Sequence, residues 1–313
     1  MEKVAILGCG TMGHSIALSA AWANYEVIVF GLNEQDIENA KTGLQVKLAT
    51  LLEEEAITQQ TARLIHSNIK FSTSLQEVVQ DKTFIIEAIP ENLALKQQTF
   101  IQLEEITSET TVIASNTSGI MPSLLAEKMR YPNRLVITHF WNPAHLVPLV
   151  EIVKGDKTDD ATVDRTMALM HQFHKKPIKI EKEIAGFVGN RLQFALFREA
   201  QHLYELGIAS KEDIDAAVVY SIGRRLSVTG PLISADMTGL DVVQDISDYL
   251  FEDLSATNQV GPTVAKLRKQ NHLGYKTGQG YYKWTEALST TANKEREQTL
   301  IKHLKQDLEK TLR

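Results

Sequence analysis

The first thirty residues constrain the fold of this chain more than any other part of it. A short apolar segment, residues 3–7, runs directly into Gly8-Cys9-Gly10-Thr11-Met12-Gly13. A helical run over residues 14–23 and a second apolar segment over residues 26–30 follow. This order of strand, G-x-G-x-x-G, helix and strand is the context in which three glycines bind a dinucleotide. We therefore predict a parallel sheet with a nucleotide site at the end of its first strand.

Each glycine of this motif has its own mechanical role. Gly8 allows the tight turn, Gly10 lets a pyrophosphate approach the backbone, and Gly13 permits close packing of helix and strand. The helix that starts here offers free N–H groups and a positive dipole end to an anion. The residues predicted to bind the cofactor through this loop are Gly8, Gly10, Thr11, Met12 and Gly13.

The residue that usually binds the adenosine ribose is absent. An Asp or Glu is expected at the end of the second strand, about twenty residues after the glycines, and this chain has Gly31 there. Asn33 or Glu34 could reach the ribose from the loop. No lysine or arginine follows until Lys41, so nothing selects a 2′-phosphate. We predict NAD as the cofactor, and the glycine leaves NADP open.

Two further apolar strands are predicted at residues 83–89 and 111–114. Ligands collect at the carboxyl ends of parallel strands. The side chains expected beside the cofactor at these ends are Glu91, Lys96 and Asn116. Glu91 could instead stabilise the first turn of a helix predicted over residues 93–106. Ser118 faces the same crevice or caps the next helix, and local sequence favours neither.

A histidine and a carboxylate follow on neighbouring predicted strands. His139 ends the β-branched run of residues 134–137, and Glu151 begins the next strand-like segment, residues 151–153. Imidazole has an unperturbed pKa near 6.5, and a carboxylate partner fixes its tautomer and raises its basicity. The pair is therefore a candidate for a general base and its orienting partner. The alternative is a structural histidine and a solvated surface carboxylate.

The motifs taken in order resemble the 3-hydroxyacyl-CoA dehydrogenase family. The first half contributes the glycine loop, Glu87-Ala88-Ile89-Pro90-Glu91, Ser115-Asn116-Thr117-Ser118 and His139-Phe140-Trp141-Asn142-Pro143. The second half contributes Gly186-Phe187-Val188-Gly189-Asn190-Arg191-Leu192, Gly230-Pro231-Leu232, Gly239-Leu240-Asp241 and the segment from Gly274 to Tyr282. The resemblance covers residues 3 to about 284.

This resemblance implies reversible, NAD-dependent oxidation of a 3-hydroxyacyl substrate, with His139 and Glu151 as the catalytic pair. It also implies that Ser118 and Asn190 bind the reacting oxygen and the surroundings of the histidine, and that Asn142 lines the substrate cleft. A homodimer through the C-terminal domain is implied as well. We expect a short-chain 3-hydroxyacyl-CoA as substrate in fatty acid metabolism. A free β-hydroxy acid such as gulonate or carnitine is the alternative, because no cluster of cations for a coenzyme A tail stands out.

Length and composition set the remaining expectations. A chain of 313 residues is long enough for two domains. We predict an α/β architecture, with a Rossmann-type doubly wound sheet domain over residues 1–183 and an all-helical substrate and dimerisation domain over residues 184–313. The last helix of that domain is predicted over residues 294–312. A formal charge of −6 argues against a general nucleic-acid binder.

Several features indicate a cytoplasmic enzyme without a metal. The first ten residues run into a strand, so no signal peptide is expected, and no apolar stretch is long enough to span a membrane. Cys9 is the single cysteine, which excludes an internal disulfide. The nine histidines form no ligand-spaced cluster. The missing acid at Gly31 keeps one other class open, a non-catalytic dinucleotide sensor, against which the set of Ser118, His139, Glu151 and Asn190 argues.

Overall fold

The computed structural model describes residues 2–311, with side chains up to residue 309. It divides into two compact units. The first unit runs to Val188 and resumes at Lys294, and the second unit is Gly189–Asn293. Each unit is described separately below.

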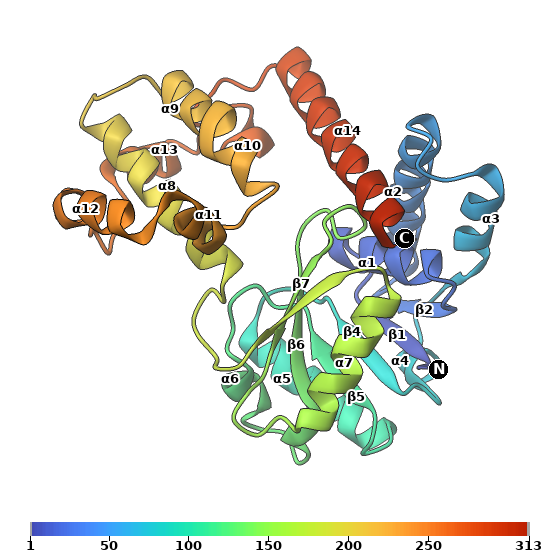
Figure 1. The fold of residues 1–313 in the computed structure, drawn as a ribbon. Helices are drawn as coiled ribbons and strands as arrows, with labels where there is room; N and C mark the ends of the chain where they lie inside the picture. Colours follow the sequence, from blue (N-terminus) through green and yellow to red (C-terminus); the bar gives the residue numbers. More distant parts are fainter. Residues whose placement is uncertain (1, 312–313) are drawn as a thin grey trace. The chain divides into compact units, whose positions relative to one another are not determined.

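The first unit is built on an eight-stranded sheet with the order β3-β2-β1-β4-β5-β6-β7-β8 (Figure 1). Its neighbouring strands are parallel except for β6 and β7, which are antiparallel. The strands are β1 Val4–Leu7, β2 Val27–Phe30, β3 Ile69–Ser72, β4 Phe84–Glu87, β5 Val112–Ser115, β6 Leu135–Phe140, β7 Leu149–Val153 and β8 Lys176–Ile180. The doubly wound sheet predicted from the glycine motif is confirmed.

Helices cover both faces of this sheet. The helices of the first unit are α1 Thr11–Trp22, α2 Glu34–Glu53, α3 Gln59–Ser67, α4 Leu75–Val79, α5 Leu93–Ile106, α6 Pro122–Ala126 and α7 Asp160–Gln172, with a 3₁₀ turn η1 at Pro132–Arg134. One buried cluster joins the sheet to α1, α2, α3 and α7, and a second joins the other face to α4, α5 and α6. In β1, Val4 and Ile6 face the first cluster while Ala5 and Leu7 face the second. Strands buried on both faces explain the continuous apolar runs in the sequence.

The second unit is helical. Its helices are α8 Gly189–Glu205, α9 Lys211–Ala217, a π-helical turn η2 Val218–Ile222, α10 Gly223–Leu226, α11 Pro231–Thr238, α12 Leu240–Leu250, α13 Pro262–Lys269 and a 3₁₀ turn η3 Tyr275–Thr277. Ser210 caps α9, and its hydroxyl accepts a hydrogen bond from the Asp213 amide at 3.1 Å. The predicted all-helical architecture after the sheet is confirmed.

The C-terminal helix differs from its predicted place. Helix α14 spans Glu286–Thr311, so it begins before residue 294. From Lys294 onward it belongs to the first unit, because Ile301 and Leu304 are buried in the cluster around α1. The compact units thus divide at Val188 and at Lys294, and the domains 1–183 and 184–313 stay a prediction. Ser118 does not cap a helix either, because α6 begins at Pro122 with Met121 at its N-cap.

Candidate active site

His139 and Glu151 meet across two strands of the first unit. They are directly opposed in the antiparallel register of β6 and β7, so their side chains project from the same face of the sheet. His139 Nδ1 lies 2.7 Å from Glu151 Oε2. The imidazole is 5% exposed and the carboxylate is fully buried. The structure therefore brings together the two side chains that the sequence predicts as a base and its orienting partner.

Other donors surround the Glu151 carboxylate. Oε1 accepts a hydrogen bond from the backbone amide of Val188 at 2.9 Å. Oε2 also accepts one from the indole Nε1 of Trp141 at 3.3 Å. A buried carboxylate is costly unless such partners replace water. Together these donors hold Glu151 as an acceptor for His139.

Two aromatic rings fix the plane of the imidazole. The ring centroid of His139 lies 5.7 Å from that of Trp141 and 5.6 Å from that of Phe187. Phe187 is fully buried and has a positive φ of 52°. A phenylalanine in this conformation is strained, and such strain persists only where the surroundings impose it. The segment before α8 is thus shaped to place this ring against His139.

The pair has the arrangement of a general base. With the carboxylate at Nδ1, the proton of the neutral ring resides on Nδ1 and Nε2 is left to accept another. Glu151 also stabilises the imidazolium that forms when Nε2 takes a proton. The site can therefore move a proton at the carboxyl end of β6.

The glycine loop fits a dinucleotide. Gly8 has a φ of 97°, and a Cβ there would meet the Ala88 carbonyl oxygen at 2.6 Å. A Cβ on Gly13 would meet the Gly8 carbonyl oxygen at 1.7 Å, so this glycine packs against the loop itself. Nothing lies within 4 Å of a Cβ on Gly10, which caps α1 without a side-chain hydrogen bond. Thr11 and Met12 form the first turn of α1. Open backbone beside a helix N-terminus is what a pyrophosphate needs.

Gly31 has a steric cause. A Cβ at this position would lie 2.5 Å from Ile37 Cγ1 and 3.1 Å from Cys9 Sγ. The space that a ribose-binding carboxylate would need is therefore filled. Asn33 is the N-cap of α2, and its Oδ1 accepts a hydrogen bond from the Asp36 amide at 2.9 Å. Its contact with the ribose stays a prediction.

Lys96 is buried between two carboxylates, and its contact with the cofactor stays a prediction. Its ammonium lies 2.6 Å from Glu87 Oε1 and 3.3 Å from Glu91 Oε2. Lys96 is 1% exposed and Glu87 is fully buried. Burial raises the pKa of Glu87, and the charge of Lys96 and the hydrogen bonds from Lys96, Ser115 and Ile89 oppose that rise. Glu91 is the exposed member of this group.

Glu91 connects two loops at the carboxyl edge. Its Oε1 accepts hydrogen bonds from the Thr117 hydroxyl and, at 3.1 Å, from the Ser118 amide. Asn116 links the ends of β5 and β6, because its Oδ1 accepts a hydrogen bond from the Phe140 amide at 2.9 Å. The exposed Ser118 thus lies on a fixed loop at the edge that also carries His139.

The remaining candidates lie on two different units. Asn142 follows β6 and precedes a cis peptide bond to Pro143, and its carbonyl accepts a hydrogen bond from Arg296 Nη2 of α14 at 3.4 Å. Asn190 is the second residue of α8, in the second unit. The substrate roles of Ser118, Asn142 and Asn190 stay predictions from the resemblance.

Sequence reasoning missed the residues that complete the histidine pair. Trp141 and Phe187 lay inside recognised motifs, yet their contacts with Glu151 and His139 join segments far apart in the chain.

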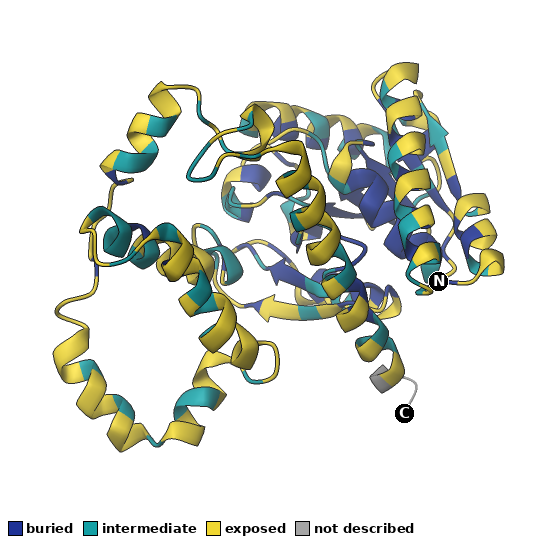
Figure 2. Cartoon of the chain, turned by 90° about the horizontal axis from the view of Figure 1, so that it is seen from above, coloured by how far each residue is buried: buried dark blue, intermediate teal, exposed yellow. Residues whose placement is uncertain are grey.

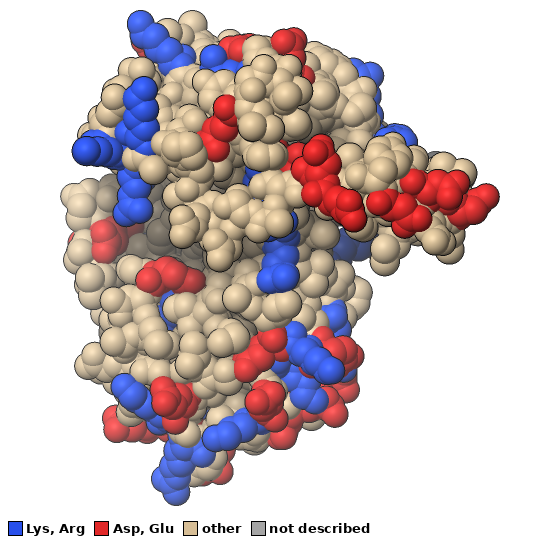
Figure 3. Space-filling view, turned by 90° about the vertical axis from the view of Figure 1, so that its left-hand side faces the viewer, with Lys and Arg blue, Asp and Glu red and all other residues tan. Residues whose placement is uncertain are grey.

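Among residues 2–311, no three His, Cys, Asp or Glu side chains gather into a possible metal site. None of the helices in that range is both long and apolar enough to cross a membrane. On the face shown in Figure 3, basic and acidic side chains are mixed over the lower part, and acidic side chains gather toward the right-hand edge.

Comparison with known proteins identifies the family. The NAD-binding domain of 3-hydroxyacyl-CoA dehydrogenase matches residues 3–184, and the C-terminal domain of that enzyme matches residues 186–284. A 5-formyl-3-hydroxy-2-methylpyridine 4-carboxylate 5-dehydrogenase from Mesorhizobium japonicum is 32% identical over 301 residues, 96% of each chain.

Two solved structures are similar over most of the chain. A crystal structure of a 5-formyl-3-hydroxy-2-methylpyridine 4-carboxylic acid 5-dehydrogenase, an NAD+-dependent dismutase, has a TM-score of 0.90 at 32% identity and covers 96% of this chain and 97% of its own. A (S)-3-hydroxybutyryl-CoA dehydrogenase from Ralstonia eutropha has a TM-score of 0.75 at 31% identity and covers 91% of this chain and 100% of its own. With an NAD-binding domain at its N-terminus, this chain belongs to the 3-hydroxyacyl-CoA dehydrogenase family.

Proposed function

We propose that this protein interconverts a hydroxyl and a carbonyl group with NAD, using His139 as general base and Glu151 as its orienting partner. The observation that carries the proposal is the buried contact of 2.7 Å between His139 Nδ1 and Glu151 Oε2. NAD, when bound, supplies the nicotinamide that accepts the hydride. His139 Nε2 takes the hydroxyl proton as the hydride leaves, so negative charge does not build up on the alcohol oxygen.

Three polar side chains complete the proposed substrate site. Ser118 and Asn190 bind the reacting oxygen and the surroundings of His139, and Asn142 lines the cleft. Ser118 and Asn142 both follow strands that end at the carboxyl edge of the sheet, where ligands of such sheets bind. Holding the carbinol carbon in place supplies much of the rate acceleration.

The substrate we favour is a small free carboxylic acid rather than a CoA thioester. The support for this choice is the similarity to the pyridine-carboxylate dehydrogenase structure, which has a TM-score of 0.90. The family match ends at residue 284, before α14 begins at Glu286. The pyridine-carboxylate dehydrogenase structure covers 96% of this chain, which requires it to match part of this 26-residue helix. The 3-hydroxybutyryl-CoA dehydrogenase structure matches along its whole length but covers 91% of this chain. A 3-hydroxyacyl-CoA dehydrogenase structure from Archaeoglobus fulgidus covers 97% of this chain, so a match to α14 does not by itself separate the two candidates.

The position of α14 links it to the site. Arg296 of this helix donates to the carbonyl of Asn142, three residues after His139. Gln298 Nε2 and Lys305 Nζ bind Glu54 at the end of α2, each at 2.6 Å. A helix shared with a relative that acts on a small carboxylate thus lies against the loop that follows the base. A short-chain 3-hydroxyacyl-CoA is the second candidate, favoured by the family match over both domains.

A turnover assay tests both candidates. Purified protein is mixed with NAD and, in separate reactions, 3-hydroxybutyryl-CoA, 3-hydroxybutyrate, carnitine, gulonate and 5-formyl-3-hydroxy-2-methylpyridine 4-carboxylate, with NADP as a parallel series. Nicotinamide reduction is followed by absorbance. We expect turnover with a free acid. Turnover confined to the thioester would move the assignment to the second candidate, and calorimetric binding of NAD without turnover on any compound would favour a sensor.

We also propose that the second unit pairs with a second copy of the chain. Ile214 is the one large apolar side chain of this unit that is buried. Most of its helices are exposed along their length in Figure 2. Val228 and Leu232 are 84% and 82% exposed. An apolar surface of this extent is normally covered, and a second copy is the occupant because it brings the same surface to a two-fold interface.

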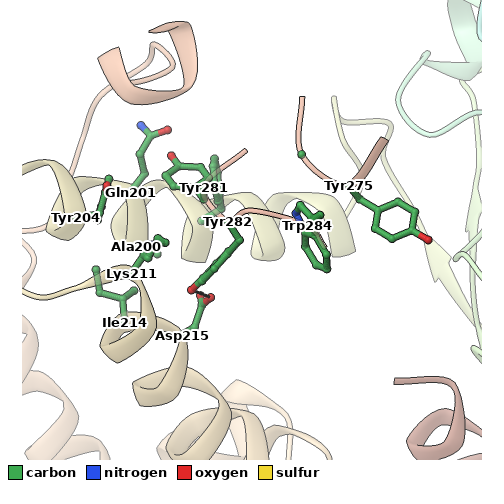
Figure 4. Close-up of a pocket in the computed structure, with 12 residues that line it drawn as sticks. Ala200, Gln201, Tyr204, Lys211, Ile214, Asp215, Tyr275, Tyr281, Tyr282 and Trp284 are labelled. Carbon is green, nitrogen blue, oxygen red and sulfur yellow. Dashed lines mark hydrogen bonds between the residues drawn. The ribbon is translucent and has the colours of Figure 1, made fainter. Parts of the chain in front are cut away.

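A pocket in the second unit belongs to this surface. Its volume is about 310 Å³, and aromatic rings of α8 and of residues 275–284 line it (Figure 4). Gln201 Oε1 and the Tyr281 hydroxyl are buried there and lack a hydrogen-bond partner among residues 2–309. Unpaired groups of this kind are costly. We propose that a segment of the second copy fills the pocket.

Light scattering after size-exclusion chromatography tests the pairing. We expect a mass near twice the 35.0 kDa of one chain. Leu232→Asp places a charge on the proposed interface and shifts the protein toward monomer. Leu64→Asp, which changes an exposed leucine of α3, is the matched control. A wild-type monomer at micromolar concentration would refute the pairing.

A further inference from the structure

The loop that joins the two strands of the catalytic pair is packed inside the first unit. Residues 141–148 connect β6, which carries His139, to β7, which carries Glu151. Ala144, His145 and Leu146 are each at most 3% exposed. A buried loop must find partners for its backbone carbonyls. Side chains from other elements supply them.

Lys175 provides two of these partners. It lies between α7 and β8 and is 5% exposed. Its ammonium donates to the carbonyl of Ala144 at 2.5 Å and to the carbonyl of Val147 at 3.4 Å. No ion pair joins it to a carboxylate within residues 2–309. Burying an ammonium without a counter-ion destabilises the fold. An apolar side chain would fill the same space without this cost, so the ammonium points to a specific role.

Helix α1 holds the same loop from another side. The Ser15 hydroxyl and His145 Nδ1 lie 2.8 Å apart, and the same hydroxyl accepts from the His145 amide at 3.2 Å. Ser19 donates to the carbonyl of Ala144 at 3.3 Å. The loop is therefore fixed from α1 and from Lys175 together.

Within residues 2–309, no acidic side chain lines the small cavity beside Lys175. The small cavity beside it is lined by Ser19 and Trp22 of α1, by His145 and His174, and by Phe173, Leu304 and Leu308. Burial alone lowers the pKa of Lys175 to about 7. Burial and the nearby cations Lys47 and Lys175 lower the pKa of His145 to about 3, so this histidine is neutral near pH 7. Leu304 and Leu308 of α14 help to close the site.

We infer that Lys175 is a positioning residue for the catalytic pair, acting through the loop of residues 141–148. The loop begins with Trp141, whose indole donates to Glu151 Oε2, and with Asn142, a proposed substrate residue. Fixing Ala144 and Val147 restrains this loop, which holds Trp141 against His139. This inference rests on the proposed function, because it assigns Lys175 a part in the same chemistry.

The test compares two adjacent lysines. Lys175→Met removes the buried ammonium and keeps most of the length of the side chain. Lys176→Met is the control, because the side chain of Lys176 is exposed. The hydrogen bond from its backbone amide to the Pro148 carbonyl is kept in this variant. The turnover number, the KM for NAD and the titration of the His139 ring by NMR on ¹⁵N-histidine-labelled protein are measured for each variant and for Lys175→Arg.

Lys175→Met is expected to lower the turnover number on the order of tenfold to a hundredfold, the scale of a small misplacement in an active site. The KM for NAD should stay as in the wild type, and the titration midpoint of His139 should shift. Lys175→Arg should restore part of the rate, and Lys176→Met should match the wild type. A folded Lys175→Met protein with wild-type turnover and an unchanged His139 titration would overturn the inference.

A wild-type measurement covers the case in which Lys175→Met does not fold. With lysine side chains also labelled, the His139 ring signals should show a second, smaller step at the pH where Lys175 titrates. Absence of that step would overturn the inference. The NMR titration needs no substrate, so it separates this inference from the proposed function. If the wild type turns over none of the compounds above, the proposed function fails, while the titration still shows whether Lys175 positions His139.

Discussion

Glu151 faces His139 across the antiparallel pair β6–β7, and one of its carboxylate oxygens serves both the imidazole and the indole of Trp141. The strand register sets the pairing, while the tryptophan and the amide of Val188 set the orientation of the carboxylate. Changes at position 139 remove the base. Changes at position 151 leave the imidazole in place, but they remove the carboxylate that fixes its tautomer and the orientation of its ring.

His139→Gln should abolish turnover and leave the affinity for NAD nearly intact, because the glycine loop is separate from the base. Glu151→Gln should retain some activity but lower the rate on the order of a hundredfold or more, the usual scale for losing general-base function, and shift the pH–rate profile. Steady-state rates and calorimetric NAD titrations measure both effects. His66→Gln, at an exposed position on α3, is the control. An active His139→Gln protein would remove this residue from the mechanism.

Gly10→Ala should weaken NAD binding without destabilising the fold. A methyl group there meets no atom within 4 Å and the φ of −61° suits alanine, but it occupies the space that a pyrophosphate needs. We expect NAD affinity to fall by tenfold or more, about 1.4 kcal/mol or above. Gly230→Ala, also in open space, is the control. Thermal melts and calorimetry separate the two quantities, and unchanged NAD affinity in Gly10→Ala would contradict the assignment of this loop.

Lys96→Met should destabilise the protein strongly. It leaves the fully buried Glu87 without its charge partner, and breaking a buried pair in this way costs about 3–5 kcal/mol. Adding Glu87→Gln should recover part of that loss, because no buried charge remains. Lys41→Met breaks an exposed pair with Glu38 and should cost less than about 1 kcal/mol. Urea unfolding measures the free energy of unfolding of these three variants. Equal losses of that free energy in Lys96→Met and Lys41→Met would refute the prediction.

His145 should make the first unit sensitive to acid. Burial lowers its pKa from 6.5 to about 3 in the folded protein, so between these values the unfolded chain binds a proton that the folded chain does not. Stability is therefore lost as the pH falls below 6.5, by about 2 kcal/mol at pH 5. Melting temperatures at pH 7 and pH 5 should differ less in His145→Gln than in the wild type. The same difference in both proteins would contradict the prediction, and His66→Gln should behave as the wild type.

The sheet and the contact between His139 and Glu151 were predictable because their signals are local. The glycines at positions 8, 10 and 13 are required by the backbone geometry of a single turn. Apolar runs indicate strands that are buried on both faces. His139 and Glu151 could be paired because one lies at the end of a predicted strand and the other at the start of the next. The loop between the two strands is short. The helical second unit followed from capping and periodicity, as at Ser210 and Asp213.

The sequence could not show which surfaces these elements bury. Leu300, Leu304 and Leu308 predict a helix with an apolar face, yet nothing in them specifies that the face packs against α1 and α2. The carboxyl end of β4 predicts Lys96 beside the cofactor, but no local pattern indicates that its ammonium is buried against Glu87. Trp141 and Val188 reach Glu151 through tertiary contacts that no local pattern encodes.

The lack of space at Gly31 makes the effect of a substitution there depend on the residue at position 37. An acidic residue there requires volume that Ile37 and Cys9 occupy, so its introduction alone strains the start of α2. Trimming Ile37 first opens that volume at the ordinary cost of a lost methylene or two. Substitutions in contact are not additive, and here the order in which they arise decides whether the intermediate protein is sound. An acidic residue at position 31 is therefore expected to be tolerated better in a chain that already has a smaller side chain at position 37.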